Sequence, residues 1–417
     1  MKRIRTDEVA KARIDPVDTE TIARAHAIVT DVRLRGEAAL REYAEKFGDL
    51  EKGAPLVIRG DAFAKALASL DRKDRDVLER TAKRISTFAI AQKNALAGMV
   101  IDVPGGSAGH EIAPMERAGC YAPGGRYPLP STVLMTAVTA RVAGVREVWV
   151  ASPKPSAMTL AACAVAGVDA LLAVGGAQSI AALAHGAGDV PACDVIVGPG
   201  NRYVTAAKQV VSGNVAIDML AGPSELVVIA DSSADPDVVA ADLLAQAEHD
   251  PDALPVLITW DESVATAVDA AIERALVDLS TKSIAQKALE NGFTVIATSP
   301  EDAAHASNLL APEHLEVQVR DLDAILPRLE HYGALFLGPA AAEVFGDYGV
   351  GPNHVLPTGG RARFVGGLSV FTFLRVRTWL RMDHAPASLV EDVAALARHE
   401  GLEAHARAAE ARVSKKK

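Results

Sequence analysis

Residues 170–187 read ALLAVGGAQSIAALAHGA and contain the unit from which much of the chain is built. A short apolar run leads into Gly175 and Gly176, and a segment that we expect to be helical follows. Residues 194–211, DVIVGPGNRYVTAAKQVV, repeat the order of strand, glycine turn and helix. Apolar strands that alternate with helices are typical of parallel sheets covered on both faces, so the sequence predicts a doubly wound α/β domain.

The same pattern extends along the chain in both directions. A strand at 145–151 precedes the quoted stretch, and a second α/β domain of similar design is predicted from strands at 225–230, 254–260, 293–297, 315–319 and 334–337. Residues 18–96 predict helices, and residues 389–413 predict terminal helices that must dock on their own chain or on a partner. We therefore expect an N-terminal helical region, a first α/β domain, a second α/β domain, and a loop with a C-terminal helical arm, at 1–110, 111–222, 223–345 and 346–417.

Composition excludes several classes of protein. The chain has 417 residues, 49% of them hydrophobic, which is enough for substantial cores. A formal net charge of -10 argues against a general nucleic-acid-binding protein. The first residues are basic but lack the apolar region of a secretion signal, and the three cysteines have no metal-type spacing. We expect a soluble protein of the cytoplasm.

Residues 235–250 predict a helix that presents two polar side chains near its end. Asp235 is a suitable N-cap, and Pro236 fits the first helical position. Gln246 and His249 are three residues apart, so an amide oxygen and an imidazole nitrogen could share one ion. The alternative is that His249 is an ordinary structural histidine.

A second stretch, 311–317, places Glu313 and His314 side by side before an apolar strand. An adjacent acid and imidazole form a plausible acid–base pair, although a salt-linked surface dipeptide is the alternative. Asp347 lies in a turn-forming sequence and His405 in an ordinary predicted helix. If these two converge with Gln246 and His249, they form a ligand set suited to zinc with open coordination.

Three glycine-containing loops, at 175–178, 198–201 and 221–224, are expected at the carboxyl ends of strands, where α/β proteins bind ligands. None of the three matches the dinucleotide pattern G-x-G-x-x-G, and plain tight turns are the alternative to phosphate binding.

Ten stretches of the chain, in order, resemble motifs of the histidinol dehydrogenase family. They lie at 32–40, 121–125, 131–135, 174–178, 198–201, 217–219, 221–225, 246–249, 312–315 and 353–358. Among them are Val174-Gly175-Gly176-Ala177-Gln178, Gly198-Pro199-Gly200-Asn201, Gln246-Ala247-Glu248-His249 and Pro312-Glu313-His314-Leu315.

The resemblance implies two incomplete Rossmann-like domains and an enzyme that uses NAD and Zn²⁺ to oxidise L-histidinol through L-histidinal to L-histidine, in the final steps of histidine biosynthesis. It implies metal ligands at Gln246, His249, Asp347 and His405. It implies NAD contacts at Tyr121, Gln178 and Asn201. Substrate contacts would be Ser224, His314 and Glu400, besides the four metal ligands. The family is a homodimer with a swapped C-terminal arm, so His405 and Glu400 would complete the site of the other chain.

In the chemistry that the resemblance implies, His314 removes the alcohol proton as hydride leaves for NAD. Glu313 then activates the water that hydrates the aldehyde, and His314 takes a proton again during the second hydride transfer. Zinc would hold and orient the substrate.

Three details depart from the family pattern. Residues 126–130 replace a run of small residues, Asp250 stands where glycine is frequent, and the region of Gly360 lacks an aromatic residue. Arg126 leaves open a related enzyme that oxidises a sulfonated diol such as 2,3-dihydroxypropane-1-sulfonate, although Glu400 and His405 favour histidinol. Two other classes are a zinc hydrolase in which Glu313 activates water, and a non-catalytic metal-binding protein.

Overall fold

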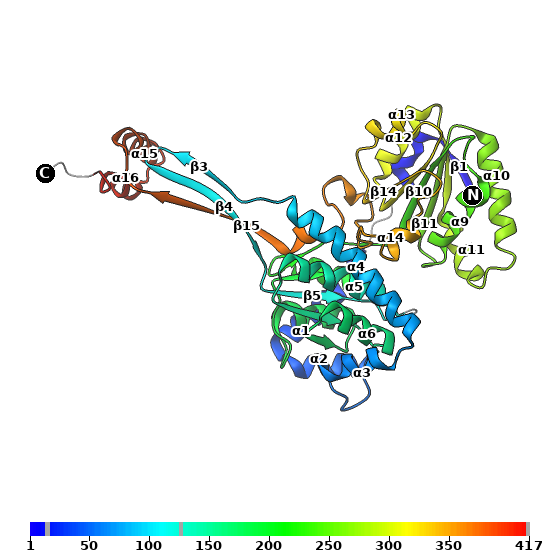
Figure 1. Cartoon of the computed structure of the whole chain (residues 1–417), viewed down its shortest axis with the longest axis horizontal. Helices are drawn as coiled ribbons and strands as arrows, with labels where there is room; N and C mark the ends of the chain where they lie inside the picture. Colours follow the sequence, from blue (N-terminus) through cyan, green and yellow to red (C-terminus); the bar gives the residue numbers. More distant parts are fainter. Residues whose placement is uncertain (13–16, 125–127, 414–417) are drawn as a thin grey trace. The chain divides into compact units, whose positions relative to one another are not determined.

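The computed structural model describes residues 1–12, 17–124 and 128–413. The larger of two compact units comprises Met1–Ala91 and Met115–Phe373, and the smaller comprises Gln92–Pro114 and the described residues from Leu374 onward (Figure 1). Parallel sheets flanked by helices confirm the predicted α/β fold. Arg126 and Tyr127 of the unusual predicted loop lie outside the described residues.

The first sheet of the larger unit has, within the described residues, six strands in the order β2-β7-β6-β5-β8-β9. All neighbours are parallel except β2 and β7. Its strands are β2 (Val57–Arg59), β5 (Arg117–Tyr121), β6 (Glu147–Ala151), β7 (Ala170–Leu172), β8 (Val195–Val197) and β9 (Ala216–Ile217). The prolines and glycines within residues 120–128 predict a turn-rich loop, but Cys120 and Tyr121 instead end the buried strand β5.

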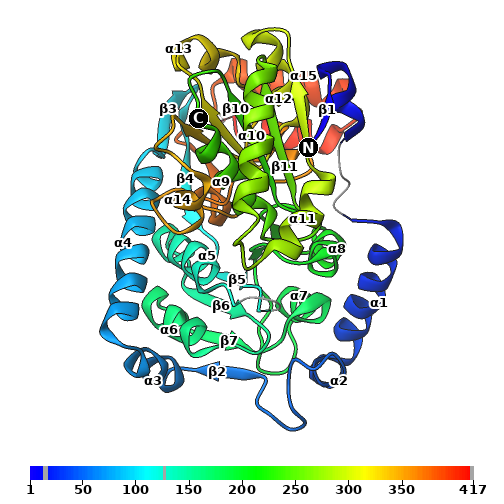
Figure 2. The same cartoon turned by 90° about the vertical axis from the view of Figure 1, so that its right-hand side faces the viewer.

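Helices cover both faces of this sheet. On one face, α5 (Pro130–Ala143) packs on β5 and β6, and α6 (Ala157–Ala166) packs beside it. The core of the other face draws on α1 (Thr19–Arg35), α2 (Glu37–Lys46), α7 (Gly176–His185) and α8 (Arg202–Val211). Figure 2 shows α1 next to α8 and α2 next to α7. The helical spacing of Ala25, Val29 and Val32 places all three in this core, which explains why the N-terminal helices form.

Two further helices of the N-terminal region were also predicted. They are α3 (Asp61–Ser69) and α4 (Arg72–Asn94). The start of the chain contributes β1 (Lys2–Ile4), which joins the second sheet parallel to β12. The domain boundaries expected from the sequence stay predictions.

The second sheet has, among the described residues, six parallel strands in the order β1-β12-β11-β10-β13-β14. Besides β1, its strands are β10 (Glu225–Ala230), β11 (Leu254–Thr259), β12 (Phe293–Ile296), β13 (His314–Gln318) and β14 (Ala334–Leu337). One face is covered by α9 (Pro236–Ala247), α10 (Glu262–Ala275) and α11 (Lys282–Asn291). The other face is covered by α12 (Pro300–Leu310) and α13 (Leu322–Ile325).

The strand orders of the two sheets correspond. Numbered along the chain, β7-β6-β5-β8-β9 and β12-β11-β10-β13-β14 both run third, second, first, fourth, fifth, which is the Rossmann order. In each sheet the order reverses between the first and fourth strands of this series, at β5 and β8 or at β10 and β13. The predicted similarity of design between the two domains is confirmed.

A long loop after α14 (Glu343–Asp347) contacts elements from both sheets. The Asn353 side chain donates to the Met135 carbonyl of α5 at 2.8 Å, and Gly359 N donates to Glu225 Oε1 at the start of β10 at 2.8 Å. The Gly222 amide donates to the Thr358 hydroxyl at 2.5 Å. The loop is therefore tied to the first sheet's helix α5 and to the start of the second sheet.

The smaller unit is built on an antiparallel sheet, whose strands within the described residues run in the order β15-β4-β3. Its elements are β3 (Met99–Val103), β4 (Gly106–Pro114), β15 (Leu374–Met382), α15 (Ala387–His399) and α16 (Glu403–Glu410). The two terminal helices were predicted, whereas the β3–β4 hairpin was not. No helix among the described residues combines the length and apolarity needed to cross a membrane.

Candidate active site

Two of the predicted functional residues meet where β10 and β13 begin. These strands are parallel neighbours with Leu226 opposite His314. The Ser224 hydroxyl donates to Glu313 Oε2 at 2.7 Å, and the Glu225 amide donates to the same oxygen at 2.8 Å. Because Glu313 is 6% exposed, the alternative of a surface salt-linked dipeptide is wrong. The sheet therefore holds a buried carboxyl group with one of its oxygens fixed by two donors.

The His314 ring has a defined orientation beside this carboxyl group. Its Nδ1 lies 3.1 Å from the Glu225 carbonyl oxygen, which only accepts hydrogen bonds, so Nδ1 carries the proton. Its Nε2 has no hydrogen-bond partner among the described residues and lies 3.7 Å from Asp347 Oδ1. Burial lowers the pKa of His314 to about 4, so the ring is neutral near pH 7 and Nε2 is available to accept a proton.

Burial has the opposite effect on Glu313, whose pKa it raises well above the usual carboxyl value. The hydrogen bonds from Ser224 and the Glu225 amide lower this pKa, and the nearby Glu225 and Asp347 carboxylates raise it. The pKa values of Glu313 and His314 are thus moved by their environment in opposite directions, as is common for acid–base groups in active sites.

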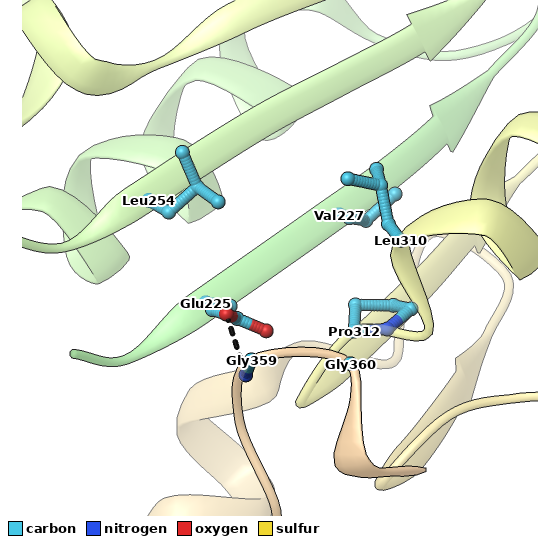
Figure 3. Close-up of a pocket in the computed structure, with 7 residues that line it drawn as sticks. All are labelled: Glu225, Val227, Leu254, Leu310, Pro312, Gly359 and Gly360. Atoms are coloured by element: carbon cyan, nitrogen blue, oxygen red, sulfur yellow. Dashed lines mark hydrogen bonds between the residues drawn. The ribbon is translucent and has the colours of Figure 1, made fainter. Parts of the chain in front are cut away.

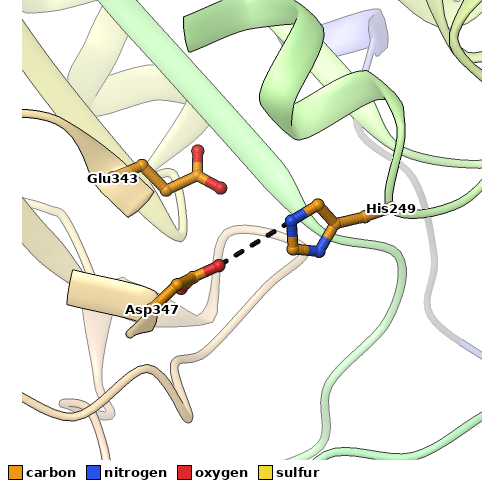
Figure 4. A group of neighbouring side chains, drawn as sticks. All are labelled: His249, Glu343 and Asp347. Atoms are coloured by element: carbon orange, nitrogen blue, oxygen red, sulfur yellow. Dashed lines mark ion pairs between the residues drawn. The ribbon is translucent and has the colours of Figure 1, made fainter. Parts of the chain in front are cut away.

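A second cluster adjoins His314 and contains His249, Glu343 and Asp347 (Figure 4). One ligand atom from each of the three lies within 4.8 Å of the others, and His249 Nε2 is 3.8 Å from Asp347 Oδ2. Both carboxylate oxygens of Glu343 are buried without a hydrogen-bond partner among the described residues. Three donors of metal-binding type therefore converge on one point.

The Gln246 side chain lies near the end of α9 and is completely buried. Neither its amide oxygen nor its amide nitrogen has a hydrogen-bond partner within the described part of the chain. Buried polar atoms without a partner are uncommon and costly, since they have lost water and gained nothing in return. Buried atoms without a partner, on Gln246 and on Glu343 in the cluster with His249 and Asp347, fit a site that binds a cation.

Two short helices bring these side chains together. The Asp235 carboxylate caps α9 through the Asp237 amide, Gln246 lies in the last turn, and His249 follows just after the helix end. On α14, Glu343 and Asp347 are four residues apart and so lie on one helix face. The sequence reading did not include Glu343, although its spacing from Asp347 was a usable signal.

The three predicted cofactor residues lie in the first sheet, at or after the carboxyl ends of its strands. Tyr121 ends β5, and its hydroxyl accepts from the Gly176 amide at 3.3 Å. Gln178 Nε2 donates to Asp49 Oδ2 at 3.1 Å, and Asn201 caps α8 by accepting from the amides of residues 203 and 204. The structure brings these residues to one edge, and their contact with a cofactor stays a prediction.

The third glycine loop, 221–224, does not lie where the sequence analysis expected it. It directly precedes β10 and so lies at the amino end of that strand, whereas the loops at 175–178 and 198–201 follow β7 and β8 at their carboxyl ends. The physical reason is that the loop links the two domains and enters the second sheet at its first central strand.

A small pocket lies beside the start of β10, and Figure 3 shows its lining. Its walls include the Glu225 side chain, which is held by the Gly359 amide, and the apolar side chains of Val227, Leu254 and Leu310. The carboxylate on this wall belongs to Glu225, whose backbone contacts both Glu313 and His314, so the pocket adjoins the candidate acid–base pair.

Glu400 and His405 belong to the smaller unit. Glu400 follows α15 as its C-cap, His405 lies on α16, and both are exposed within that unit. Their roles as substrate and metal contacts stay predictions.

Imidazole, carboxylate and side-chain amide oxygen atoms are suitable ligands for a divalent ion such as zinc, and the buried, partnerless atoms fit such a group. Together with the Glu313–His314 pair, they define the class of protein: an α/β enzyme with an acid–base pair next to a candidate metal centre. The family model described as "Histidinol dehydrogenase" matches residues 12–413. The chain belongs to the histidinol dehydrogenase family and is an oxidoreductase.

Similar proteins agree over nearly the whole chain. The "Histidinol dehydrogenase" of Thermus thermophilus is 46% identical over 400 residues, covering 95% of each chain. That of Natronomonas pharaonis is 45% identical and covers 92% of each. The crystal structure of "Histidinol Dehydrogenase" from Elizabethkingia anophelis has a TM-score of 0.91 at 32% identity, and covers 99% of this chain and 98% of that one.

Proposed function

We propose that the protein oxidises L-histidinol through L-histidinal to L-histidine, the final steps of histidine biosynthesis, with NAD and Zn²⁺ as cofactors. The observation that supports this proposal is the cluster of His249, Glu343 and Asp347 beside the buried Glu313–His314 pair, together with the buried and unpartnered amide of Gln246, in a chain of this family. The compartment that fits such a biosynthetic enzyme is the cytoplasm.

Gln246, His249 and Asp347 would hold the metal from one chain, and Glu343 is close enough to add a ligand or to bind the substrate amine. L-histidinol carries an imidazole and a primary amine, which are both good zinc donors. Bound zinc supplies a Lewis acid that orients the substrate, and bound NAD accepts one hydride in each of the two oxidations.

His314 supplies the base for both oxidations. When the alcohol carbon loses hydride, its hydroxyl proton passes to His314 Nε2, whose lone pair is free because Nδ1 donates to the Glu225 carbonyl. The aldehyde then adds water to form a diol, which loses a second hydride and a second proton to give the acid. His314 passes the first proton to solvent and then takes that second proton as well.

Glu313 would remove a proton from the water that hydrates the aldehyde. The donors on its Oε2, Ser224 and the Glu225 amide, leave its other oxygen to face water. Burial favours the protonated form, but a cation at the neighbouring Asp347 would offset the repulsion that raises the Glu313 pKa. A bound cation would therefore lower the pKa of Glu313, toward the carboxylate needed for this step, against the larger effect of burial.

The proposal includes a homodimer in which Glu400 and His405 of one copy complete the metal and substrate site of the other. A hybrid of His405→Asn chains and His314→Asn chains tests this arrangement. If the arm crosses, both lesions fall in one composite site, and about half of the hybrid sites work by counting alone. If each chain completes its own site, every hybrid site carries one lesion and the hybrid is inactive.

Membership of a dehydrogenase family favours oxidation over the hydrolase and the non-catalytic metal-binding protein. The competing substrate is a sulfonated diol, whose sulfonate group the Arg126 side chain would suit. Turnover of 2,3-dihydroxypropane-1-sulfonate with no turnover of histidinol would replace the proposed substrate and keep the fold and the metal site.

NADH production from L-histidinol tests the function itself. The zinc-loaded protein should form two NADH per histidinol, a chelator should abolish the reaction, and added zinc should restore it. Glu313→Gln should accumulate histidinal or stop before histidine, because only the hydration step loses its base. Formation of histidine from histidinol at the full rate by this variant would contradict the role given to Glu313.

A further inference from the structure

Lys208 is a buried lysine that neither the acid–base pair nor the candidate metal centre uses. It lies on α8 at 2% side-chain exposure, and its ammonium group pairs with the carboxylate of Asp218, whose side chain is 0% exposed. Both charges have lost their water, which is unfavourable unless the pair gains further hydrogen bonds. Such a pair is more informative about local geometry than about overall stability.

The further hydrogen bonds converge on Gly198, the first residue after β8. Lys208 Nζ donates to the Gly198 carbonyl oxygen at 3.0 Å, and the Gly198 amide donates to Asp218 Oδ2 at 2.7 Å. The other Asp218 oxygen accepts from the Met219 amide at 2.6 Å. The ion pair therefore holds Gly198 by both of its backbone polar groups and ties it to the end of β9.

Gly198 is also fixed by its contact with the end of β5. Its φ of +111° lies in the region that favours glycine, and a Cβ atom there would be 2.1 Å from the Tyr121 carbonyl oxygen. The turn after β8 thus presses against the backbone of Tyr121. The place where the strand order of the first sheet reverses is held in one shape by Lys208 and Asp218.

The turn at 198–201 ends at Asn201, which caps the first turn of α8. We infer that Lys208 and Asp218 are positioning residues for the nicotinamide cofactor: they fix the 198–201 turn between the ends of β5 and β8. The inference rests on the proposed cofactor site at Tyr121, Gln178 and Asn201. Because Lys208 and Asp218 are enclosed within the fold, they act through the backbone of Gly198.

A contact on the same helix separates this role from one in substrate binding. Thr205 lies one turn before Lys208, and its hydroxyl donates at 2.7 Å to the carbonyl of Ala221, in the loop that leads to Ser224. The cofactor turn and the substrate loop are thus held by different side chains of α8. Loss of the Lys208 charge should affect the cofactor and leave the substrate loop in place.

The test compares two variants. Lys208→Met keeps the aliphatic part of the side chain but leaves the Asp218 charge buried without its partner. The double variant Lys208→Met/Asp218→Asn removes both charges, and it serves as the test if the single variant folds poorly. Arg117→Met is the matched control. It removes an ion pair with Glu147 and a bond to the Ala192 carbonyl at the opposite, amino end of β5. NADH affinity by fluorescence, both KM values, zinc content and circular dichroism are measured for each variant.

The inference predicts that KM for NAD and Kd for NADH rise about tenfold or more in both Lys208 variants, while KM for histidinol and zinc content stay within about twofold. Arg117→Met should keep the wild-type KM for NAD. An unchanged KM for NAD in the folded neutral pair would overturn the inference, as would an equal loss in Arg117→Met.

Asn201→Ala separates this outcome from failure of the proposed cofactor site. A raised KM for NAD in Asn201→Ala with none in the Lys208 variants removes only the positioning role. An unchanged KM for NAD in Asn201→Ala shows that the cofactor lies elsewhere, and the inference falls with the site.

Discussion

The two large sheets share the order of five parallel strands but present their candidate functional residues at opposite edges. In the first sheet, Tyr121 and the turn at 198–201 lie at the carboxyl ends of β5 and β8. In the second, Ser224, Glu313 and His314 lie at the amino ends of β10 and β13, the corresponding pair of strands. Two sheets with the same order of strands can therefore carry their candidate binding residues at opposite ends of those strands.

The difference follows from which chain segments reach each edge. At the carboxyl edge of the first sheet, glycine turns open α7 and α8, where the Gly176 amide donates to the Tyr121 hydroxyl and the Asn201 side chain accepts from the first amides of α8. The amino edge of the second sheet receives the end of α9, which returns there before β11 and brings Gln246 and His249. The first edge is thus fixed by hydrogen bonds to backbone amides, and the second gathers side chains of the kind that bind metals.

Replacement of the base should give the largest effect, and only on the chemistry assigned to the second sheet. His314→Asn should lower kcat by about 10²–10⁴-fold, because the proton acceptor is lost, with little change in Kd for NADH. Steady-state kinetics and NADH fluorescence measure the two. His331→Asn, the same change at a partly exposed histidine, should leave both unchanged. A weakened NADH affinity in His314→Asn would show that the two edges are not separate in function.

A smaller effect is expected from Asn201→Ala on the first sheet. KM for NAD should rise about three- to tenfold, with zinc content unchanged, and the lost helix cap should cost about 1 kcal/mol of stability. Ser156→Ala is the matched control, since Ser156 caps α6 of the same domain by accepting from the Thr159 amide. It should lose similar stability and keep its KM for NAD. Equal KM values for the two variants would contradict the role of Asn201.

The smallest effect should come from the far end of the helix that carries the metal residues. Asp235→Ala removes the N-cap of α9 and should lower the free energy of unfolding by about 0.5–2 kcal/mol. Zinc affinity should stay within about twofold, because Gln246 and His249 are held at the other end of α9. Chemical denaturation and a competitive zinc titration measure these quantities, and a strongly weakened zinc affinity would show that the metal site depends on the whole helix.

Local sequence signals predicted most of the fold. Periodicity located helices within 18–96, and the Asp235 cap located α9, because a cap acts through bonds to near neighbours. β5 was missed, since its five residues contain too little pattern to separate them from the proline and glycine turn that follows. The β3–β4 hairpin was missed because its first strand is largely exposed and has no buried alternation.

The site was only partly accessible to the same reasoning. The adjacent Glu313 and His314 were apparent as a pair, but their burial depends on the pairing of β10 with β13, which joins residues far apart in the sequence. That His249 and Asp347 lie together was implied only by the family resemblance, and Glu343, which the structure places with them, was not predicted. Contacts over such separations are set by packing, which spacing does not encode.

The division between the two edges is tested most directly by zinc content and NADH affinity measured together in Gln246→Ala and Asn201→Ala. The account predicts that Gln246→Ala loses zinc and keeps NADH affinity, and that Asn201→Ala keeps zinc and loses NADH affinity. Loss of both properties in both variants, or the reverse assignment, would contradict it.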